Sequence, residues 1–168
     1  MRTLYVLRHA KSTWDRSELA DHERPLAPRG RRAAHALAGR IERLGIAPTL
    51  VLCSTAVRAR ETLDALAPTL GAGVEVYLDD GLYAAGVEEL LIRLRRVPDS
   101  VTAVLLVGHN PGLQDLVLEL CSDGDPDELD RVREKFPTCA LATLTIADCS
   151  WAKLSGGAAT LRSLLVPG

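Results

Sequence analysis

The stretch VTAVLLVGHNPG at residues 101–112 and the stretch LYVLRHAKS at residues 4–12 each join an apolar run to a histidine. The continuous apolar run of the first stretch is typical of a central strand covered on both faces, and the LYVL of the second predicts another buried strand. Open α/β sheets bind their ligands just beyond the carboxyl ends of parallel strands. We therefore expect His9 and His109 to lie at the same crevice.

Predicted strands and helices alternate along the rest of the chain. The expected strands cover residues 4–7, 50–53, 74–78, 101–107, 139–146 and 158–166. Between them, small and apolar residues recur at helical spacing and are bounded by Gly and Pro. This order predicts a three-layer α/β/α fold with a mostly parallel central sheet, built as one domain over residues 1–168, with the last two strands as an antiparallel edge.

Two segments lack a regular pattern. Residues 11–24 are polar and charged without sustained periodicity, so we expect a loop over the crevice. Residues 122–130 are acidic and predict a second loop, followed by a short amphipathic piece before Pro137.

Composition excludes several classes of protein. The chain has 168 residues, of which 47% are hydrophobic and 25% charged, and a net charge of -2, which fits a globular domain and not a nucleic-acid-binding one. Local basic clusters at 29–32 and 93–96 are interpreted as solvated helix faces. No apolar run reaches the ~20 residues of a membrane span, and no signal peptide is evident. The four cysteines show no metal-ligand spacing, so we expect free thiols in the cytoplasm.

The residues at the strand ends suit phosphoryl chemistry. His9 directly follows a buried strand, and with an unperturbed pKa of ~6.5 much of its ring is neutral near pH 7, so a ring nitrogen can attack phosphorus. Arg58 lies one turn into the helix after strand 50–53, and its planar guanidinium matches phosphate oxygens. His109 precedes the helix that begins near Pro111, whose free amide groups favour an anion. Taken singly, His9 and Arg58 also fit ordinary structural roles.

These motifs together resemble the histidine phosphatase superfamily, which includes the cofactor-dependent phosphoglycerate mutases, and within it the short phosphohistidine phosphatase branch of SixA. The resemblance covers nearly the whole chain. It rests on residues 7–12, 24–26 with 29–30, 54–62, 108–111 and 159–167. It implies a phosphoglycerate mutase-like fold and a phosphatase that needs neither a metal nor a cofactor.

The resemblance also implies roles for single residues. His9 would be transiently phosphorylated, and water would then hydrolyse the phosphohistidine. The phosphoryl oxygens would be held by two guanidinium groups and an imidazolium, those of Arg8, Arg58 and His109, which would stabilise the transferring group electrostatically. Ser12 and Asn110 are expected as further phosphate contacts.

Some positions depart from the family pattern. Family members commonly carry Gly-Glu where this chain has Ala10-Lys11, and Thr or Ser where Ala27 stands. Lys11 adds positive charge and favours a more anionic substrate. Mutase-like members place a glutamate as general acid after the third strand, whereas this chain offers Asp79 and Asp80, of which we prefer Asp80.

The missing glutamate bears on the substrate. A sugar alkoxide needs a well-placed acid to leave, while the imidazole of a phosphohistidine leaves with less help. The short segment between the third and fourth strands also leaves little room for a lid. We therefore expect a phosphorylated protein, dephosphorylated at phosphohistidine, as the partner, with small phosphate esters as the alternative substrates.

Three other interpretations compete with this one. A cysteine phosphatase would use Cys53, but four residues separate it from Arg58, one fewer than in that class, and the glycines of its loop are absent. A phosphate-binding module without turnover is disfavoured because both histidines and both arginines are present. A metal site on His9 and His109 lacks an evident third ligand.

Overall fold

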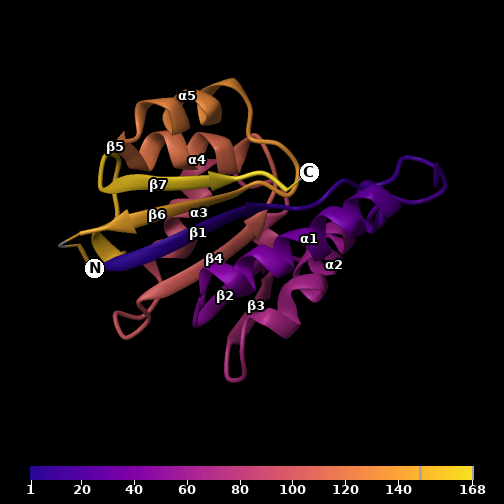
Figure 1. The fold of residues 1–168 in the computed structure, drawn as a ribbon, viewed down its shortest axis with the longest axis horizontal. Helices are drawn as coiled ribbons and strands as arrows, with labels where there is room; N and C mark the ends of the chain where they lie inside the picture. Colours follow the sequence, from indigo (N-terminus) through magenta and orange to yellow (C-terminus); the bar gives the residue numbers. More distant parts are fainter. Residues whose placement is uncertain (148, 168) are drawn as a thin grey trace.

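A computed structural model describes residues 1–147 and 149–167 and shows one sheet between two layers of helices (Figure 1). The seven strands are β1 (Arg2–Arg8), β2 (Leu50–Ser54), β3 (Glu75–Asp79), β4 (Ala103–Gly108), β5 (Cys121–Gly124), β6 (Leu141–Ile146) and β7 (Ala159–Leu165). Their order across the sheet is β3-β2-β4-β1-β6-β7-β5.

The direction of the strands divides the sheet. β3, β2, β4 and β1 run parallel, and β5 runs parallel to β7, whereas β6 is antiparallel to both of its neighbours. The expectation of a mostly parallel α/β sheet with an antiparallel C-terminal pair is confirmed. The outer edge on that side is β5, however, and not β7.

The acidic segment after residue 121 is more ordered than we expected. In place of a loop over 122–130, the chain forms β5 and then α5 (Pro126–Glu134). The Asp125 carboxylate caps α5 by accepting hydrogen bonds from the backbone N–H groups of Asp127 and Glu128. Acidic residues in a first helical turn are favoured by the helix dipole. β5 lacks apolar alternation and exists because it pairs with β7, which local sequence does not reveal.

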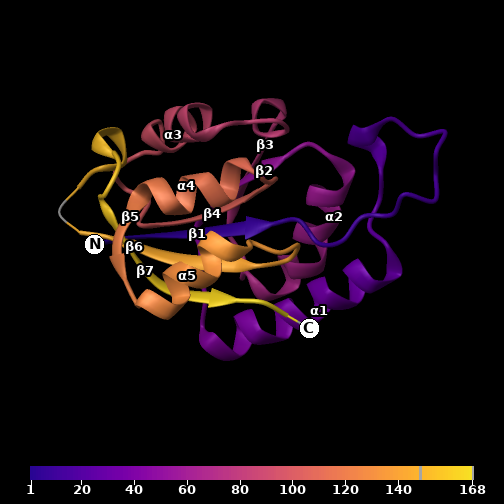
Figure 2. The same ribbon diagram turned by 90° about the horizontal axis from the view of Figure 1, so that it is seen from above.

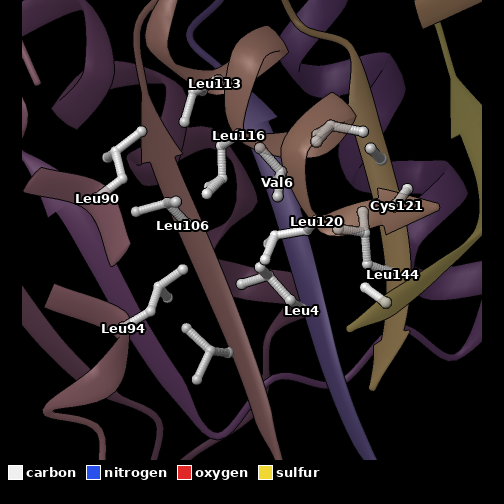
Figure 3. Packing of buried hydrophobic residues seen from close by; sticks show 14 of the residues in the cluster. Leu4, Val6, Leu90, Leu94, Leu106, Leu113, Leu116, Leu120, Cys121 and Leu144 are labelled. Atoms are coloured by element: carbon white, nitrogen blue, oxygen red, sulfur yellow. The ribbon is translucent and has the colours of Figure 1, made fainter. Parts of the chain in front are cut away.

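The helices cover the two faces of the sheet (Figure 2). α1 (Pro28–Leu44) and α2 (Val57–Leu66) pack on one face, and α3 (Val87–Arg95), α4 (Gly112–Leu120) and α5 pack on the other. Alternation along β1 sends Leu4 and Val6 into the core under α3 and α4 and sends Leu7 into the core under α1 and α2. Figure 3 shows the first of these cores.

This packing fixes the chain where β1 and β4 end. The two strands are parallel neighbours, with Arg8 opposite Gly108, so His9 and His109 leave the sheet side by side. Leu106 and Val107 beneath them are fully buried, and each such side chain contributes about 1.5–3 kcal/mol of burial free energy. The backbone that carries the two histidines is therefore held rigidly by the core.

The polar segment after β1 extends beyond the carboxyl ends of the strands, as expected of a loop over the crevice (Figure 1). It contains a short 3-10 helix, η1 (Asp21–Glu23), and returns through a bridge between Ser12 and Leu26. Within the described part of the chain, no helix combines the length and apolar character needed to cross a bilayer.

Candidate active site

A cavity of about 540 Å³ lies at the carboxyl ends of β1 and β4; we call it the strand-end cavity. The structure brings six of the residues proposed from the sequence to its wall, Arg8, His9, Ser12, Arg58, His109 and Asn110. Asp80 is not among the lining residues.

His9 is held in one tautomer. Its side chain is buried, with 7% of the residue exposed, and Nδ1 lies 2.7 Å from the Ala10 carbonyl oxygen. A carbonyl only accepts, so Nδ1 carries the hydrogen and Nε2 carries the free lone pair. The Arg58 Nε–H donates to this Nε2 at 3.3 Å. The unprotonated nitrogen of His9 therefore lies against a guanidinium group.

The charge state of His9 follows from its surroundings. Burial lowers its pKa to about 4, and the positive charges of Arg58, Arg8 and Arg24 act in the same direction, while the bond to Ala10 opposes them. The ring is therefore neutral at pH 7. Its Nε2 lone pair carries no proton and accepts the hydrogen bond from Arg58.

The backbone behind His9 is fixed by α2. The Thr62 hydroxyl, which is fully buried, accepts a hydrogen bond from the Ala10 N–H at 2.9 Å and donates to the Arg58 carbonyl at 2.7 Å. The same residue thus anchors the segment that orients His9 and the turn that carries Arg58.

His109 lies beside His9, with 5.1 Å between the ring centroids. Its Nε2 is 2.8 Å from the hydroxyl of the fully buried Ser54, which also accepts the Ala56 N–H at 3.2 Å. Burial lowers the pKa of His109 to about 3, and the neighbouring His9 and Arg58 act in the same direction. The expected imidazolium is therefore a neutral ring in this site, which offers an N–H dipole in place of a full charge.

Arg58 is oriented by a carboxylate that we did not predict. Its Nη1 donates to the Asp21 carbonyl at 2.7 Å and its Nη2 lies 3.1 Å from Asp21 Oδ2. Asp21 also accepts from Arg24 Nε at 3.0 Å and from the Tyr83 hydroxyl. The Tyr83 hydroxyl and both arginines lower the pKa of Asp21 to about 2. Asp21 thus stays ionised and aims Arg58 at His9.

Arg8 brings a second guanidinium to the cavity. Its Nη1 donates to the Phe136 carbonyl at 3.1 Å, and its buried Nε has no hydrogen-bond partner in the described chain. Burial and the charge of Arg58 lower its pKa. Positive charge is therefore concentrated around the two neutral histidines.

The two further contacts expected for phosphate have partners within the protein. The Asn110 amide donates to the Phe136 carbonyl at 3.0 Å and its Oδ1 accepts the Gln114 N–H at 3.2 Å. The Ser12 hydroxyl accepts from Arg24 Nη1 at 2.6 Å. Both side chains thus brace the wall of the cavity.

The carboxylates are distributed differently from our expectation. Asp80 begins a 3-10 turn after β3, and its Oδ1 accepts the Thr55 hydroxyl at 2.5 Å, outside the cavity lining. Ala56 is the N-cap residue of α2, and the hydroxyls of Thr55 and Ser54 instead form hydrogen bonds with Asp80 and His109. The lining carboxylates are those of Asp21 and Asp115.

The competing interpretations can now be compared with the geometry. Cys53 is fully buried on β2, does not line the cavity and has its pKa raised to about 12 by burial, so it offers no thiolate. The thiols are free, as expected. Among residues 1–147 and 149–167, no three His, Cys, Asp or Glu side chains group as metal ligands.

Asp21, Thr62 and Tyr83 were missed because their neighbours in space are distant in sequence. Asp21 lies 37 residues from Arg58, in a segment without periodicity, and Thr62 lies 52 residues from Ala10. Arg24 and Thr62 belong to stretches on which the family resemblance rests, and this resemblance was the one sequence feature that could have pointed to them.

Comparisons with known proteins place the chain in a family. Residues 4–86 match the model of the histidine phosphatase superfamily, branch 1. An uncharacterized protein from Mycobacterium tuberculosis strain H37Rv is 40% identical over 163 residues, which are 96% of this chain and 99% of the relative. The chain belongs to the histidine phosphatase superfamily.

Solved structures extend this relationship. A protein from Nakamurella multipartitia assigned as the phosphohistidine phosphatase SixA is 35% identical with a TM-score of 0.84, and the match covers 99% of this chain and 96% of that one. A protein from Agrobacterium tumefaciens with the same assignment is 29% identical with a TM-score of 0.84, covering 99% and 98% of the two chains. These likenesses support a phosphatase of the histidine phosphatase type.

Proposed function

We propose that this protein is a metal-independent phosphatase that transfers the phosphoryl group to His9 and acts on phosphohistidine in a protein. The observation that carries the proposal is the state of His9. Its Nδ1 is anchored on Ala10 and its neutral Nε2 faces the Arg58 guanidinium. A neutral, oriented nucleophile beside positive charge is what attack on an anionic phosphoryl group requires.

The first step forms a bond between His9 Nε2 and phosphorus while the bond from phosphorus to the substrate imidazole breaks. The leaving imidazole takes a proton from solvent. Arg8, Arg58 and the His109 N–H hold the three phosphoryl oxygens as charge develops on them. We assign the Ser54 hydroxyl as the donor to His109 Nε2, which leaves the Nδ1–H of His109 for the phosphoryl group.

In the second step water attacks phosphorus, the bond to His9 Nε2 breaks, and inorganic phosphate leaves with the protons of the attacking water. The neutral ring is then restored. Asp21 acts as a positioning residue, because it holds the two Nη atoms of Arg58 and so directs its Nε to His9.

The state of Asp21, one of the two carboxylates in the lining, supports this substrate class. Asp21, with a pKa of about 2 and three hydrogen-bond donors around it, is unsuited to protonate an alkoxide. Asp80 lies outside the lining. A phosphohistidine needs less acid assistance, since its imidazole leaves readily once protonated.

Turnover on matched substrates tests the proposal. A phosphohistidine protein, a sugar phosphate and an aryl phosphate would be compared under the same conditions, with His9→Ala as the control. We expect kcat/KM to be highest on phosphohistidine and to vanish in the variant. A higher kcat/KM on the sugar phosphate would move the assignment to small esters, and binding without turnover of any compound would identify a phosphate-binding module.

A further inference from the structure

A second cavity, of about 470 Å³, adjoins the strand-end cavity. The two share Lys11 and Thr138 in their walls. The rest of the second lining is Arg29, Arg32, Ala33, Ala36 and Pro167. We call this cavity the basic pocket, because three of its seven lining residues are cationic.

One face of α1 builds most of the basic pocket. Arg29, Arg32, Ala33 and Ala36 are spaced i, i+3, i+4 and i+7, so they share a side of the helix. The small alanines leave a hollow beside the two long cationic side chains. The sequence pattern alone suggested only a solvated helix face, and the hollow next to the strand-end cavity is what the structure adds.

The cations of the basic pocket are available to a ligand. Lys11, Arg29 and Arg32 are exposed, and in the described part of the chain no carboxylate forms an ion pair with them. Arg31 on the neighbouring face of α1 differs, since it pairs with Glu61 at 3.3 Å. Arg29 and Arg32, which form no ion pair in the described chain, therefore lie on the face of α1 that borders the strand-end cavity.

The basic pocket is held at a fixed place relative to His9. The Ala27 N–H donates to the Lys11 carbonyl at 2.9 Å just before α1 begins. A Cβ at Gly30 would lie 2.0 Å from the same carbonyl oxygen, so the first turn of α1 packs directly on the backbone two residues after His9. A ligand that spans both cavities would meet a rigid arrangement.

We propose that the basic pocket binds an acidic side chain of the phosphorylated protein, close to the residue whose phosphoryl group enters the strand-end cavity. This inference rests on the proposed function. Guanidinium groups match carboxylates in planar geometry, and Lys11 lies between the two cavities. The chain as a whole carries a net charge of -2, so this positive surface is local and can select among partners.

Two synthetic peptides test the proposal. Both carry a phosphohistidine at the centre, flanked by glutamates in one peptide and by glutamines in the other, and phosphoramidate serves as a substrate without side chains. The variant R29Q/R32Q is compared with R40Q/R43Q, which makes the same charge change at the same spacing on the same helix, about 16 Å further along its axis.

We expect R29Q/R32Q to raise KM for the glutamate peptide about fivefold, the size of two exposed ion pairs, with kcat unchanged. Turnover of the glutamine peptide and of phosphoramidate should stay as in the wild type. R40Q/R43Q should behave as the wild type throughout. Added salt should reduce the preference for glutamate.

Equal kcat/KM of the wild type on the two peptides would overturn the basic pocket while leaving the proposed function intact. The same conclusion would follow if R40Q/R43Q lost as much kcat/KM on the glutamate peptide as R29Q/R32Q. A separate measurement covers failure of the proposed function. The unphosphorylated glutamate peptide should inhibit phosphoramidate hydrolysis more strongly than its glutamine twin, and R29Q/R32Q should abolish the difference. If the glutamate peptide inhibits more strongly but neither phosphopeptide is turned over, phosphohistidine in a protein is not the substrate, and the basic pocket is retained. Equal inhibition by the two peptides would reject the basic pocket.

Discussion

The floor and the rim of the strand-end cavity are built in different ways. The floor comes from strand ends and the first turn of α2. His9 and Arg58 line it and Ser54 lies behind it; each is at most 7% exposed and is hydrogen-bonded to another of the three or to the backbone. The rim comes from the loop after β1, where Trp14 is 72% exposed and Lys11 is free in solvent. A rigid floor suits one chemical step, while an exposed rim suits the choice of what carries the phosphoryl group.

Removing His9, the proposed nucleophile, should have the largest effect on activity. We expect His9→Ala to lower kcat/KM on every substrate by at least about 10⁴-fold, as for other covalent catalysts that lose the attacking group. Single-turnover kinetics, with circular dichroism to check folding, measure this. Retention of a tenth of the activity would mean that another group accepts the phosphoryl.

Removing the guanidinium next to His9 should have the second largest effect. Arg58→Gln should lower kcat about 10²- to 10³-fold, because a charge that stabilises the transferring oxygens is lost. The change should also raise the pKa of His9, which Arg58 lowers. Arg60→Gln is the matched control, because Arg60 lies two residues further along α2 and is exposed. Its activity should stay near that of the wild type. Equal losses in the two variants would show that only the net charge of α2 matters.

The neutral state of the floor predicts a loss of stability in acid. His9 has a pKa of about 4 in the folded protein and ~6.5 when unfolded, so below pH 6.5 the unfolded chain binds a proton that the folded chain does not. Folding stability should therefore fall as the pH drops from 6.5 to about 4, by roughly 3 kcal/mol from this one ring. His109 adds to the effect in the same direction.

Urea unfolding at pH 7 and pH 4.5 checks this prediction. His9→Gln should lose less stability between the two pH values than the wild type does. Identical losses would indicate that His9 is not held neutral by the fold. Asp21, with a pKa of about 2, loses its contribution at still lower pH.

The hydrogen bond between the Ser54 hydroxyl and His109 can be tested separately. Ser54→Ala should lower kcat about tenfold, because His109 loses the partner that sets its tautomer. Nitrogen-15 NMR of the His109 ring reports the position of the proton, which should shift from Nδ1 to a mixture. An unchanged ring spectrum with a lower Tm would assign Ser54 a purely structural role.

Asp80 should have the smallest effect, since it lies outside the floor. We expect Asp80→Asn to change kcat on a sugar phosphate, whose alkoxide needs an acid to leave, by less than about threefold, well below the 10²-fold or more typical of a general acid. Steady-state kinetics on sugar phosphate and aryl phosphate substrates decide the matter. A hundredfold loss confined to the sugar phosphate would establish Asp80 as the proton donor.

The same contrast explains what could be predicted from the sequence. His9 and His109 were predictable because each follows a strongly apolar strand, and the order of strands and helices then places them together. Arg58 followed from its place after β2. The floor is therefore largely encoded in local periodicity.

Other features depend on contacts between distant segments. β5 has no periodic signal and forms because β7 lies beside it, and Asp21 reaches Arg58 from a loop whose course no pattern specifies. The neutral state of His109 depends on burial and on neighbouring positive charge, so the expected imidazolium was wrong. The basic pocket required the close approach of Gly30 to Lys11.

The phosphoenzyme itself provides the most direct test. Rapid quenching of the protein during turnover of a phosphohistidine substrate, followed by peptide mapping under conditions that preserve phosphoramidates, would locate the phosphoryl group. We predict one phosphoryl group, bound to Nε2 of His9, appearing and decaying at rates that match turnover. Turnover that proceeds with the phosphoryl group on another residue, or with none on the protein, would contradict the central role of His9.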